Sequence, residues 1–177
     1  YLMSTKDEVM TFASGGAMAM EAYVDASYGV HSDGSSRTGM VMMMAGVAIG
    51  NWSSKQKLVT KSSTEAEIVG LSDALTNILW MRQMLIAQGY SLPPTVIFQD
   101  NQGVIKIIRG GRSPKHRTRH LNVRHFFARD KEKSGEVMLV YKKTKEMIAD
   151  IHTKPLSGWL FKELTHKLSG HFKDPEM

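Results

Sequence analysis

The chain has 177 residues, of which 42% are hydrophobic and 23% are charged, and it contains no cysteine. This length supports one domain with a core that needs neither disulfides nor a structural metal, and disulfides and thiolate zinc sites are excluded. The sequence has no apolar run long enough for a transmembrane helix, so no membrane partner is expected. It opens on Tyr1 without a secretory pattern, as expected of a segment of a longer polypeptide.

The net charge of +6 is concentrated in one segment. Residues 101–129 carry eight Lys or Arg and no Asp or Glu, so the rest of the chain sums to about −2. A localised basic block is typical of a surface that binds a phosphate backbone, although a solvated, mildly basic face would have the same composition. The candidate nucleic-acid contacts in this segment are Asn101, Gln102, Arg112, Lys115, Arg117, Arg119, His120 and Arg124.

The N-terminal third of the chain reads as strands separated by turns. Apolar and polar residues alternate over residues 18–25, which predicts a strand that ends on Asp25. Residues 28–39 are rich in Gly, Ser and Asp and predict a loop. Residues 40–49 and 52–60 predict two further strands, paired as a meander.

A helical pattern begins at Ser62. Residues 62–65 match a capping box, and Gly89 predicts the C-terminal cap. The apolar stripe between them consists of Ile68, Leu71, Leu75, Ile78, Leu79, Leu85 and Ile86. At 100° per residue, Glu67 lies closer to the centre of this stripe than Glu65, so Glu67 is expected to lean toward the sheet.

The remaining elements alternate between strand and helix. Residues 95–98 predict a central strand, and residues 136–141 predict the last strand. Residues 103–109 and 121–133 predict helices, and two more helices are expected after Thr144 and after Ser157, with Pro155 between them. A meander followed by alternating elements predicts a single α/β domain with a mixed sheet and helices on its faces.

Four acids hold positions that could support chemistry: Asp25, Glu67, Asp100 and Asp150. Asp25 and Asp100 follow strands, where ligands gather in α/β sheets, and Asp150 lies between residues expected to pack. Taken singly, each could be a turn former or an acid that favours a helix N-terminus. A cluster of them would repel strongly unless cations such as Mg²⁺ lay between the carboxylates.

Several motifs resemble the ribonuclease H domain of Ty/copia-type retrotransposon polyproteins. Two of them are residues 52–57 (W-S-S-K-Q-K) and 62–67 (S-S-T-E-A-E). The other matches, in the same order, are residues 23–26 (Y-V-D-A), 100–103 (D-N-Q-G), 117–120 (R-T-R-H) and 149–156 (A-D-I-H-T-K-P-L). The similarity extends from about residue 21 to residue 168.

The resemblance implies a ribonuclease H-like fold with a five-stranded mixed sheet, an antiparallel three-strand meander plus two parallel strands. It also implies endonucleolytic hydrolysis of the RNA strand of RNA–DNA hybrids by two Mg²⁺ ions, for which Mn²⁺ would substitute, with 5′-phosphate products. Asp25, Glu67 and Asp100 would hold one ion, and Asp25 and Asp150 the other. The reverse transcriptase polymerase domain of the same polyprotein would be a partner, in a cytoplasmic virus-like particle.

The same resemblance divides the chain into residues 1–16, the tail of the preceding reverse transcriptase or connection segment, residues 17–170, the ribonuclease H domain, and a tail of residues 171–177. One departure is residues 141–144 (Y-K-K-T), where the family usually has V-P-T. Another is the lack of a histidine in the loop before Asp150. His152, two residues further on, is expected not to be catalytic because it points away from the face of Asp150.

Two other readings remain open at this point. A ribonuclease H-like domain that is catalytically silent could serve as a nucleic-acid-binding or assembly module. An integrase or transposase core has the same fold, but its acids follow the order Asp, Asp, Glu, whereas the order here is Asp, Glu, Asp, Asp.

Overall fold

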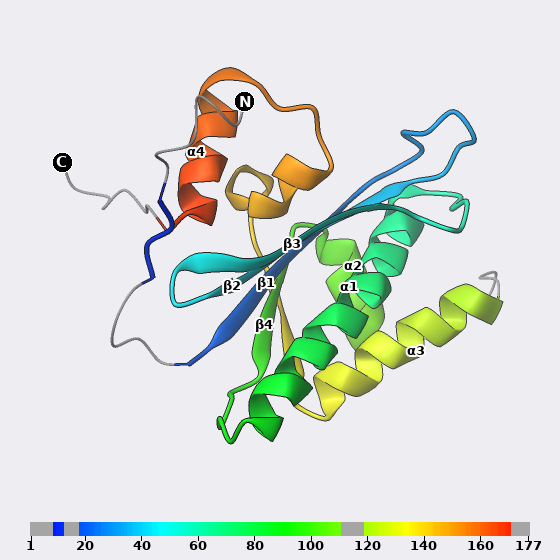
Figure 1. Ribbon diagram of the computed structural model, residues 1–177. Coiled ribbons are helices and arrows are strands. Elements are labelled where there is room, and N and C mark those ends of the chain that lie inside the picture. The colour runs from blue at the N-terminus through cyan, green and yellow to red at the C-terminus, as the bar shows by residue number, and fades with distance from the viewer. Residues whose placement is uncertain (1–8, 13–17, 111–118, 171–177) are drawn as a thin grey trace.

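The computed structural model of the chain describes residues 9–12, 18–110 and 119–170, and its centre is a five-stranded mixed sheet (Figure 1). The strands are β1 (Met20–Ser27), β2 (Arg37–Met44), β3 (Val47–Lys55), β4 (Thr95–Gln99) and β5 (Val137–Tyr141), in the spatial order β3-β2-β1-β4-β5. Strands β1, β2 and β3 pair antiparallel, whereas β4 pairs parallel with both β1 and β5. The predicted meander with two added parallel strands is confirmed.

Helices cover both faces of this sheet (Figure 1). The first face carries α1 (Ser63–Ala87), α2 (Gln102–Gly110) and α3 (Arg119–Lys133). The opposite face carries the 3₁₀ turns η2 (Thr144–Glu146) and η3 (Ile148–His152), and α4 (Gly158–Leu168). None of the helices in the described ranges has the length and apolar character needed to cross a membrane.

Strand β2 is buried on both faces, which explains its uninterrupted apolar sequence. Met40 and Met42 pack in the larger core cluster beneath α1, whereas Val41 and Met43 pack in the smaller cluster beneath η3. Successive side chains of a strand point to opposite faces, so a run of methionines and valine supplies both cores at once.

The long helix α1 begins and ends at the predicted residues. The Ser62 hydroxyl accepts a hydrogen bond from the Glu65 N–H at 3.3 Å, and Gly89 takes a φ of +92° just after the helix. The predicted stripe is buried or packed against the core as far as Leu85. Ile86 is the exception, because it is 44% exposed in the last turn of the helix.

The turn between the second and third strands differs from the prediction. Expected strands at residues 40–49 and 52–60 placed the break near Gly50, but the two-residue turn is Ala45-Gly46, with φ values of 51° and 76°. Both positive φ values are those of a type I′ hairpin, and Ala45 gives no sequence signal for one. Gly50 instead lies within β3, where the Trp52 ring covers it and a Cβ would lie 2.2 Å from that ring.

The expected helix after Thr144 is not an α-helix. The segment forms the two short 3₁₀ turns η2 and η3, while α4 follows Pro155 as predicted. Residues 147–150 are all buried, a pattern that one face of an α-helix cannot provide. A segment this short before a proline also cannot offset the cost of starting an α-helix, and 3₁₀ turns are the usual result.

Candidate metal and catalytic site

Three carboxylates meet at one edge of the sheet, each from a different element. Asp25 lies in β1, Asp100 directly follows β4, and Glu67 lies in the second turn of α1. The parallel pairing of Tyr23 with Phe98 brings the next acid of each strand to the same edge. One carboxylate oxygen from each of the three acids lies within 4.8 Å of the others. The structure thus gathers three of the four predicted acids in an arrangement that suits a divalent cation.

Glu67 is held against the sheet at 6% exposure. It accepts a hydrogen bond from Gln99 Nε2 at 3.2 Å and another from the backbone N–H of Ala26. Burial raises the pKa of this carboxyl to about 8, with a further contribution from the charge of Asp25. The prediction that Glu67 rather than Glu65 leans toward the sheet is confirmed, since Glu65 takes part in capping α1.

Asp25 is buried where β1 contacts η3. The Thr153 hydroxyl donates a hydrogen bond to Asp25 Oδ2, and the Ser27 hydroxyl donates to the Thr153 carbonyl at 2.7 Å. Asp25 is only 3% exposed, so this hydrogen bond replaces one that water would otherwise supply. The contact also ties the central carboxylate to the segment that carries Asp150.

Asp150 lies in η3, outside the cluster of three. Its Oδ2 is 2.7 Å from Lys154 Nζ, and this ammonium lies 4.0 Å from Asp25 Oδ2. Its Oδ1 is buried and has no hydrogen-bond partner in the part of the chain that the structure describes. Burial raises the pKa of Asp150, the hydrogen bond from Lys154 opposes this, and the charges of Asp25 and Asp100 add to the rise. The four acids therefore form a triad and a fourth member that faces a lysine.

The segment η3 is held on the sheet by polar contacts and by one close approach. Ser53 Oγ in β3 donates to the His152 carbonyl at 2.7 Å, and His152 Nε2 lies 3.0 Å from Asn51 Oδ1. A Cβ at Gly39 in β2 would lie 2.6 Å from Thr153 Cγ2, so only glycine admits η3 at this distance. The His152 ring is thus directed to β3, and its expected lack of a catalytic role stays a prediction.

The loop after β5 reaches Asp100. Thr144 Oγ1 donates a hydrogen bond to Asp100 Oδ2 at 2.8 Å. Lys142 Nζ lies 3.9 Å from the centre of the Phe98 ring and donates to Tyr23 Oη at 3.1 Å. Burial is the main cause that raises the pKa of Tyr23 to about 12, so its hydroxyl stays protonated. The segment in which the sequence departs most from the family therefore still supports the site.

Five of the eight predicted nucleic-acid contacts cannot be placed. Arg112, Lys115 and Arg117 lie outside the described residues. Arg119 and His120 begin α3, but their side chains are also outside the described part of the structure. Their proposed contacts with nucleic acid stay predictions.

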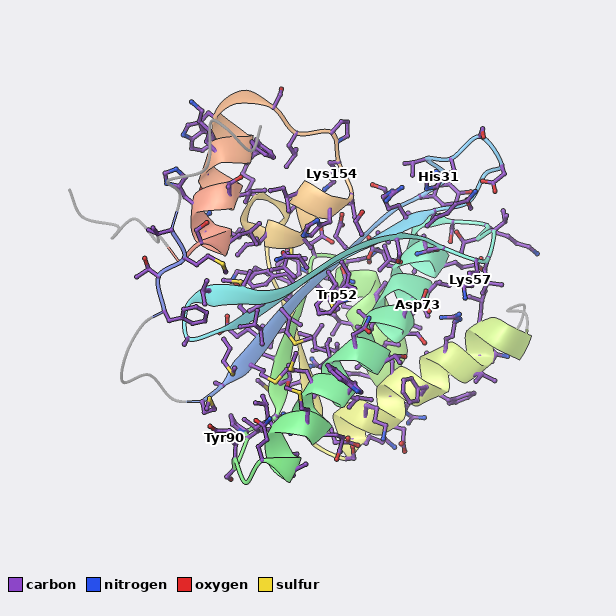
Figure 2. All side chains as sticks on the ribbon, viewed as in Figure 1. His31, Trp52, Lys57, Asp73, Tyr90 and Lys154 are labelled. Carbon is purple, nitrogen blue, oxygen red and sulfur yellow. The ribbon has the colours of Figure 1, made fainter. Side chains whose placement is uncertain are left out.

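The other three predicted contacts have defined surroundings. Asn101 Oδ1 accepts a hydrogen bond from the Val104 N–H at 3.2 Å, so it caps α2, and Gln102 is exposed in the first turn of that helix. Arg124 forms an ion pair with Asp73, which joins α3 to α1. Asp73 is labelled on α1 in Figure 2. A phosphate bound at Arg124 would share the guanidinium group with Asp73 or displace this carboxylate from it.

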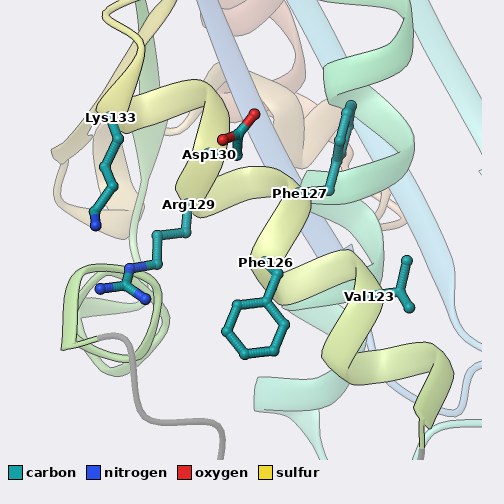
Figure 3. A pocket seen from close by; sticks show the side chains of 6 residues that line it. All are labelled: Val123, Phe126, Phe127, Arg129, Asp130 and Lys133. Atoms are coloured by element: carbon teal, nitrogen blue, oxygen red, sulfur yellow. The ribbon is translucent and has the colours of Figure 1, made fainter.

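Two hollows lie along α3, and neither is lined by any of the four acids. The first has a volume of about 570 Å³ and is lined by side chains of α3 (Figure 3). The second, of about 510 Å³, lies between α3 and α1 and shares Val123 and Phe127 with the first.

Besides Thr144, four residues around the acids had no assigned role in the sequence. Thr153 and Lys154 belong to the closing motif at residues 149–156, which assigned them no role. The four-residue spacing of Lys154 from Asp150 is nevertheless a recognisable ion-pair signal. Gln99 lies one residue beyond the predicted strand and is fully buried. Gln56, buried in the W-S-S-K-Q-K motif, donates hydrogen bonds that join β2 to the first turn of α1.

This mixed sheet, with its helices and its acids at the ends of β1 and β4, is the ribonuclease H-like fold. Among solved structures, a ribonuclease H1, LC11-RNase H1, in complex with an RNA/DNA hybrid superposes with a TM-score of 0.56 at 13% identity. The alignment covers 75% of this chain and 92% of that one. The structural neighbours of the chain are ribonuclease H domains.

The homologues of the chain are Ty1/copia-type Pol polyproteins, and the chain belongs to this family. It is 31% identical over 172 residues to the Retrovirus-related Pol polyprotein from transposon RE2 of Arabidopsis thaliana, which covers 95% of the chain. It is 32% identical over 148 residues to the Transposon Ty1-NL2 Gag-Pol polyprotein of Saccharomyces cerevisiae, which covers 82%. The chain spans only 12% and 8% of these relatives. No protein-family model matches the chain.

Proposed function

We propose that the chain is a metal-dependent ribonuclease H that hydrolyses the RNA strand of RNA–DNA hybrids during reverse transcription of a retrotransposon. The observation that carries this proposal is the cluster of Asp25, Glu67 and Asp100 at the edge of a ribonuclease H-like sheet. The homologous Pol polyproteins and a structural neighbour crystallised with an RNA/DNA hybrid support it.

The three acids fit a divalent cation. Two of them are buried, and the pKa of Glu67 is about 8 because burial and the charge of Asp25 disfavour its ionised form. Mg²⁺, or Mn²⁺ in its place, held by Asp25, Glu67 and Asp100 would offset this repulsion and supply positive charge beside the scissile phosphate. Asp25 and Asp150 are the residues that would hold a second ion and so complete a two-metal site.

The surrounding residues orient the carboxylates and bind the substrate. Thr153 holds Asp25, Gln99 holds Glu67, and Thr144 holds Asp100. We assign the basic block at residues 101–129 to the phosphate backbone of the hybrid. The 2′-hydroxyl distinguishes the RNA strand, and water attacks in line to leave 5′-phosphate and 3′-hydroxyl ends. The reverse transcriptase polymerase domain of the same polyprotein is the proposed partner.

Substitution of Asp100 tests the proposal. Changing an outer partner of a metal ligand costs about 10- to 100-fold in activity or metal affinity, so loss of a ligand should cost at least the upper figure. We expect Asp100→Asn to lower cleavage of a labelled hybrid in Mg²⁺ by about a hundredfold or more, with hybrid binding retained. Asp130→Asn, on the exposed side of α3, is the control and should cleave normally.

Cleavage by Asp100→Asn near the wild-type rate would show that this site is wrongly assigned. Hybrid binding by the wild-type chain with no cleavage in either Mg²⁺ or Mn²⁺ would instead favour a catalytically silent nucleic-acid-binding module.

A further inference from the structure

The ammonium group of Lys154 lies between two of the four acids. Its Nζ is 2.7 Å from Asp150 Oδ2 and 4.0 Å from Asp25 Oδ2. Lys154 follows η3 closely, and its backbone N–H donates to the Asp150 carbonyl at 2.9 Å, which fixes where the side chain starts. Figure 2 labels it beside η3, on the face of the sheet opposite α1.

The surroundings of Lys154 keep it charged. Burial alone would lower its pKa, but the hydrogen bond to Asp150 and the charges of Asp25, Asp150 and Asp100 outweigh burial and raise the pKa. Of the ion pairs that the structure describes, those of Lys154 are the ones that involve the four acids. The ammonium therefore supplies positive charge to one side of the site.

The other oxygen of Asp150 has no such partner. Asp150 is only 8% exposed, and its Oδ1 is buried without a hydrogen-bond partner among the described residues. A buried carboxylate oxygen without a donor is costly unless a cation or a water binds it. One carboxylate oxygen of Asp150 therefore pairs with Lys154, and the other can accept a further ligand.

These contacts divide the acids into two sets that share Asp25. The triad of Asp25, Glu67 and Asp100 gathers oxygens within 4.8 Å of one another, and the described ion pairs place no cation of the chain on Glu67 or Asp100. The pair of Asp25 and Asp150 has the Lys154 ammonium beside it. The ammonium is near only one of the three carboxylates of the triad, Asp25, whereas it is near both carboxylates of the pair, so it competes more strongly with a divalent ion at the pair.

We propose that Lys154 is a built-in counter-ion for Asp25 and Asp150, and that a divalent ion binding between these two carboxylates displaces its ammonium group. The inference rests on the proposed function, because it assumes that a divalent ion binds these acids. The lysine stem is flexible and its side chain is 37% exposed, so the ammonium can move into solvent when displaced. Binding at the pair is consequently weaker than binding at the triad.

The test is Mn²⁺ binding to the whole chain, measured by electron paramagnetic resonance and by calorimetry on metal-stripped protein. We expect the wild type to bind one tight and one weak ion, and Lys154→Met to tighten the weak one by roughly tenfold, a typical coupling between two sites. Lys154→Arg keeps the charge and should leave the weak ion weak. In EDTA, Lys154→Met should unfold at a lower temperature than the wild type, and saturating Mn²⁺ should remove this difference.

Lys167→Met is the matched control. Lys167 also pairs with an acid four residues away, Glu163, at the same distance of 2.7 Å, but that acid is not one of the four. This variant should change neither Mn²⁺ affinity. Lys154→Met could also prove so unstable that it folds only with Mn²⁺ bound, while Lys167→Met folds without it. This result would support the proposal, because it is a stronger form of the destabilisation expected in EDTA.

Unchanged or weakened binding of the second ion in Lys154→Met would overturn the proposal, as would equal effects of the two lysine variants. Hybrid cleavage measured on the same samples separates this outcome from failure of the proposed function. A wild type that cleaves while Lys154→Met shows no change in binding leaves the ribonuclease assignment standing without the counter-ion. A wild type that does not cleave contradicts the ribonuclease assignment. Tighter binding of the weak ion by Lys154→Met would still support the role of Lys154 as a counter-ion.

Discussion

At the level of single residues, Glu67 shows most clearly how the site depends on charge balance. Its carboxyl is buried against β4, beside two other acids, with a hydrogen bond from Gln99. Burial and the charge of Asp25 raise the pKa to about 8, far above that of a carboxyl in water. Without metal, the folded protein therefore favours the protonated form of Glu67.

This predicts how stability changes with pH in the metal-free protein. Because the folded-state pKa of Glu67 lies above its unfolded value of about 4.5, the stabilisation is fully present below that pH and is lost as pH rises toward about 8. The free energy of unfolding in EDTA should fall across this window, and the raised pKa of Asp150 acts in the same direction.

Urea unfolding at several pH values measures this effect, and Glu67→Gln should flatten the dependence. Glu65→Gln is the matched control, because it removes a carboxyl from the same helix outside the triad, and it should keep the wild-type slope. A Glu67→Gln protein with the wild-type slope would show that Glu67 is not the titrating group. Each unit of pKa shift corresponds to ~1.4 kcal/mol, so the loss across the window is measurable.

At the level of elements, the position of η3 on the sheet decides whether Asp150 can reach the other acids. The close approach depends on Gly39 in β2, where an added Cβ would lie 2.9 Å from His152 Cβ and 3.0 Å from the Ala149 carbonyl oxygen. A backbone atom cannot rotate aside as a flexible side chain can. The glycine is therefore part of the architecture of the site, although it is not one of its ligands.

We predict that Gly39→Ala displaces η3 and destabilises the protein by about 1–3 kcal/mol, the usual cost of overpacking. Hybrid cleavage should fall more than stability explains, since Asp150 moves with η3. Chemical unfolding and cleavage assays on the same preparation check both effects. Gly110→Ala is the control, because no atom of the described residues lies within 4 Å of its added Cβ. Normal η3 geometry in Gly39→Ala would refute the argument.

At the level of the whole molecule, the basic block at residues 101–129 contains no acid, whereas the rest of the chain carries both signs of charge. The described fold places the carboxylates at the ends of β1 and β4, and the basic block at residues 101–129 begins directly after Asp100. We expect a substrate with a phosphate backbone to contact the basic block while its reacting phosphate lies near the acids.

Salt dependence measures how strongly the basic block binds phosphates. We predict that Arg112→Gln combined with Arg117→Gln weakens hybrid binding and lowers the slope of log affinity against log salt by about one for each arginine that binds a phosphate in the wild type. Lys133→Gln with Lys162→Gln removes the same charge from exposed positions outside the block and should leave the slope nearly unchanged. Equal slopes for the two double variants would show that net charge, rather than the basic block, drives binding.

Much of this architecture could be predicted because periodicity is a local property. The stripe and caps of α1 and the short apolar strand before Asp100 each lie within a few residues, and the structure has them at those positions. The alternation over residues 18–25 also marks a strand, but β1 is displaced by two residues and continues past Asp25 to Ser27. The choice of Glu67 over Glu65 also needed only helix geometry. The hairpin turn was mispredicted because Ala45 adopts a conformation that its side chain disfavours, and the strand pairing imposes it.

The sequence alone determined the order of the elements, the class of sheet and which acids stand at strand ends, since each follows from neighbouring residues. Only the tertiary structure decided how those acids are held. The Thr153 hydroxyl reaches Asp25 across 128 residues of sequence, Gln99 reaches Glu67 across 32, and Lys154 reaches Asp25 as well as its neighbour Asp150. The four-residue spacing of Lys154 from Asp150 is a local signal, but no pattern of spacing encodes the contacts with Asp25 and Glu67, because these form only when separate elements pack together. The carboxylate triad, and the contact of Lys154 with Asp25, result from that packing.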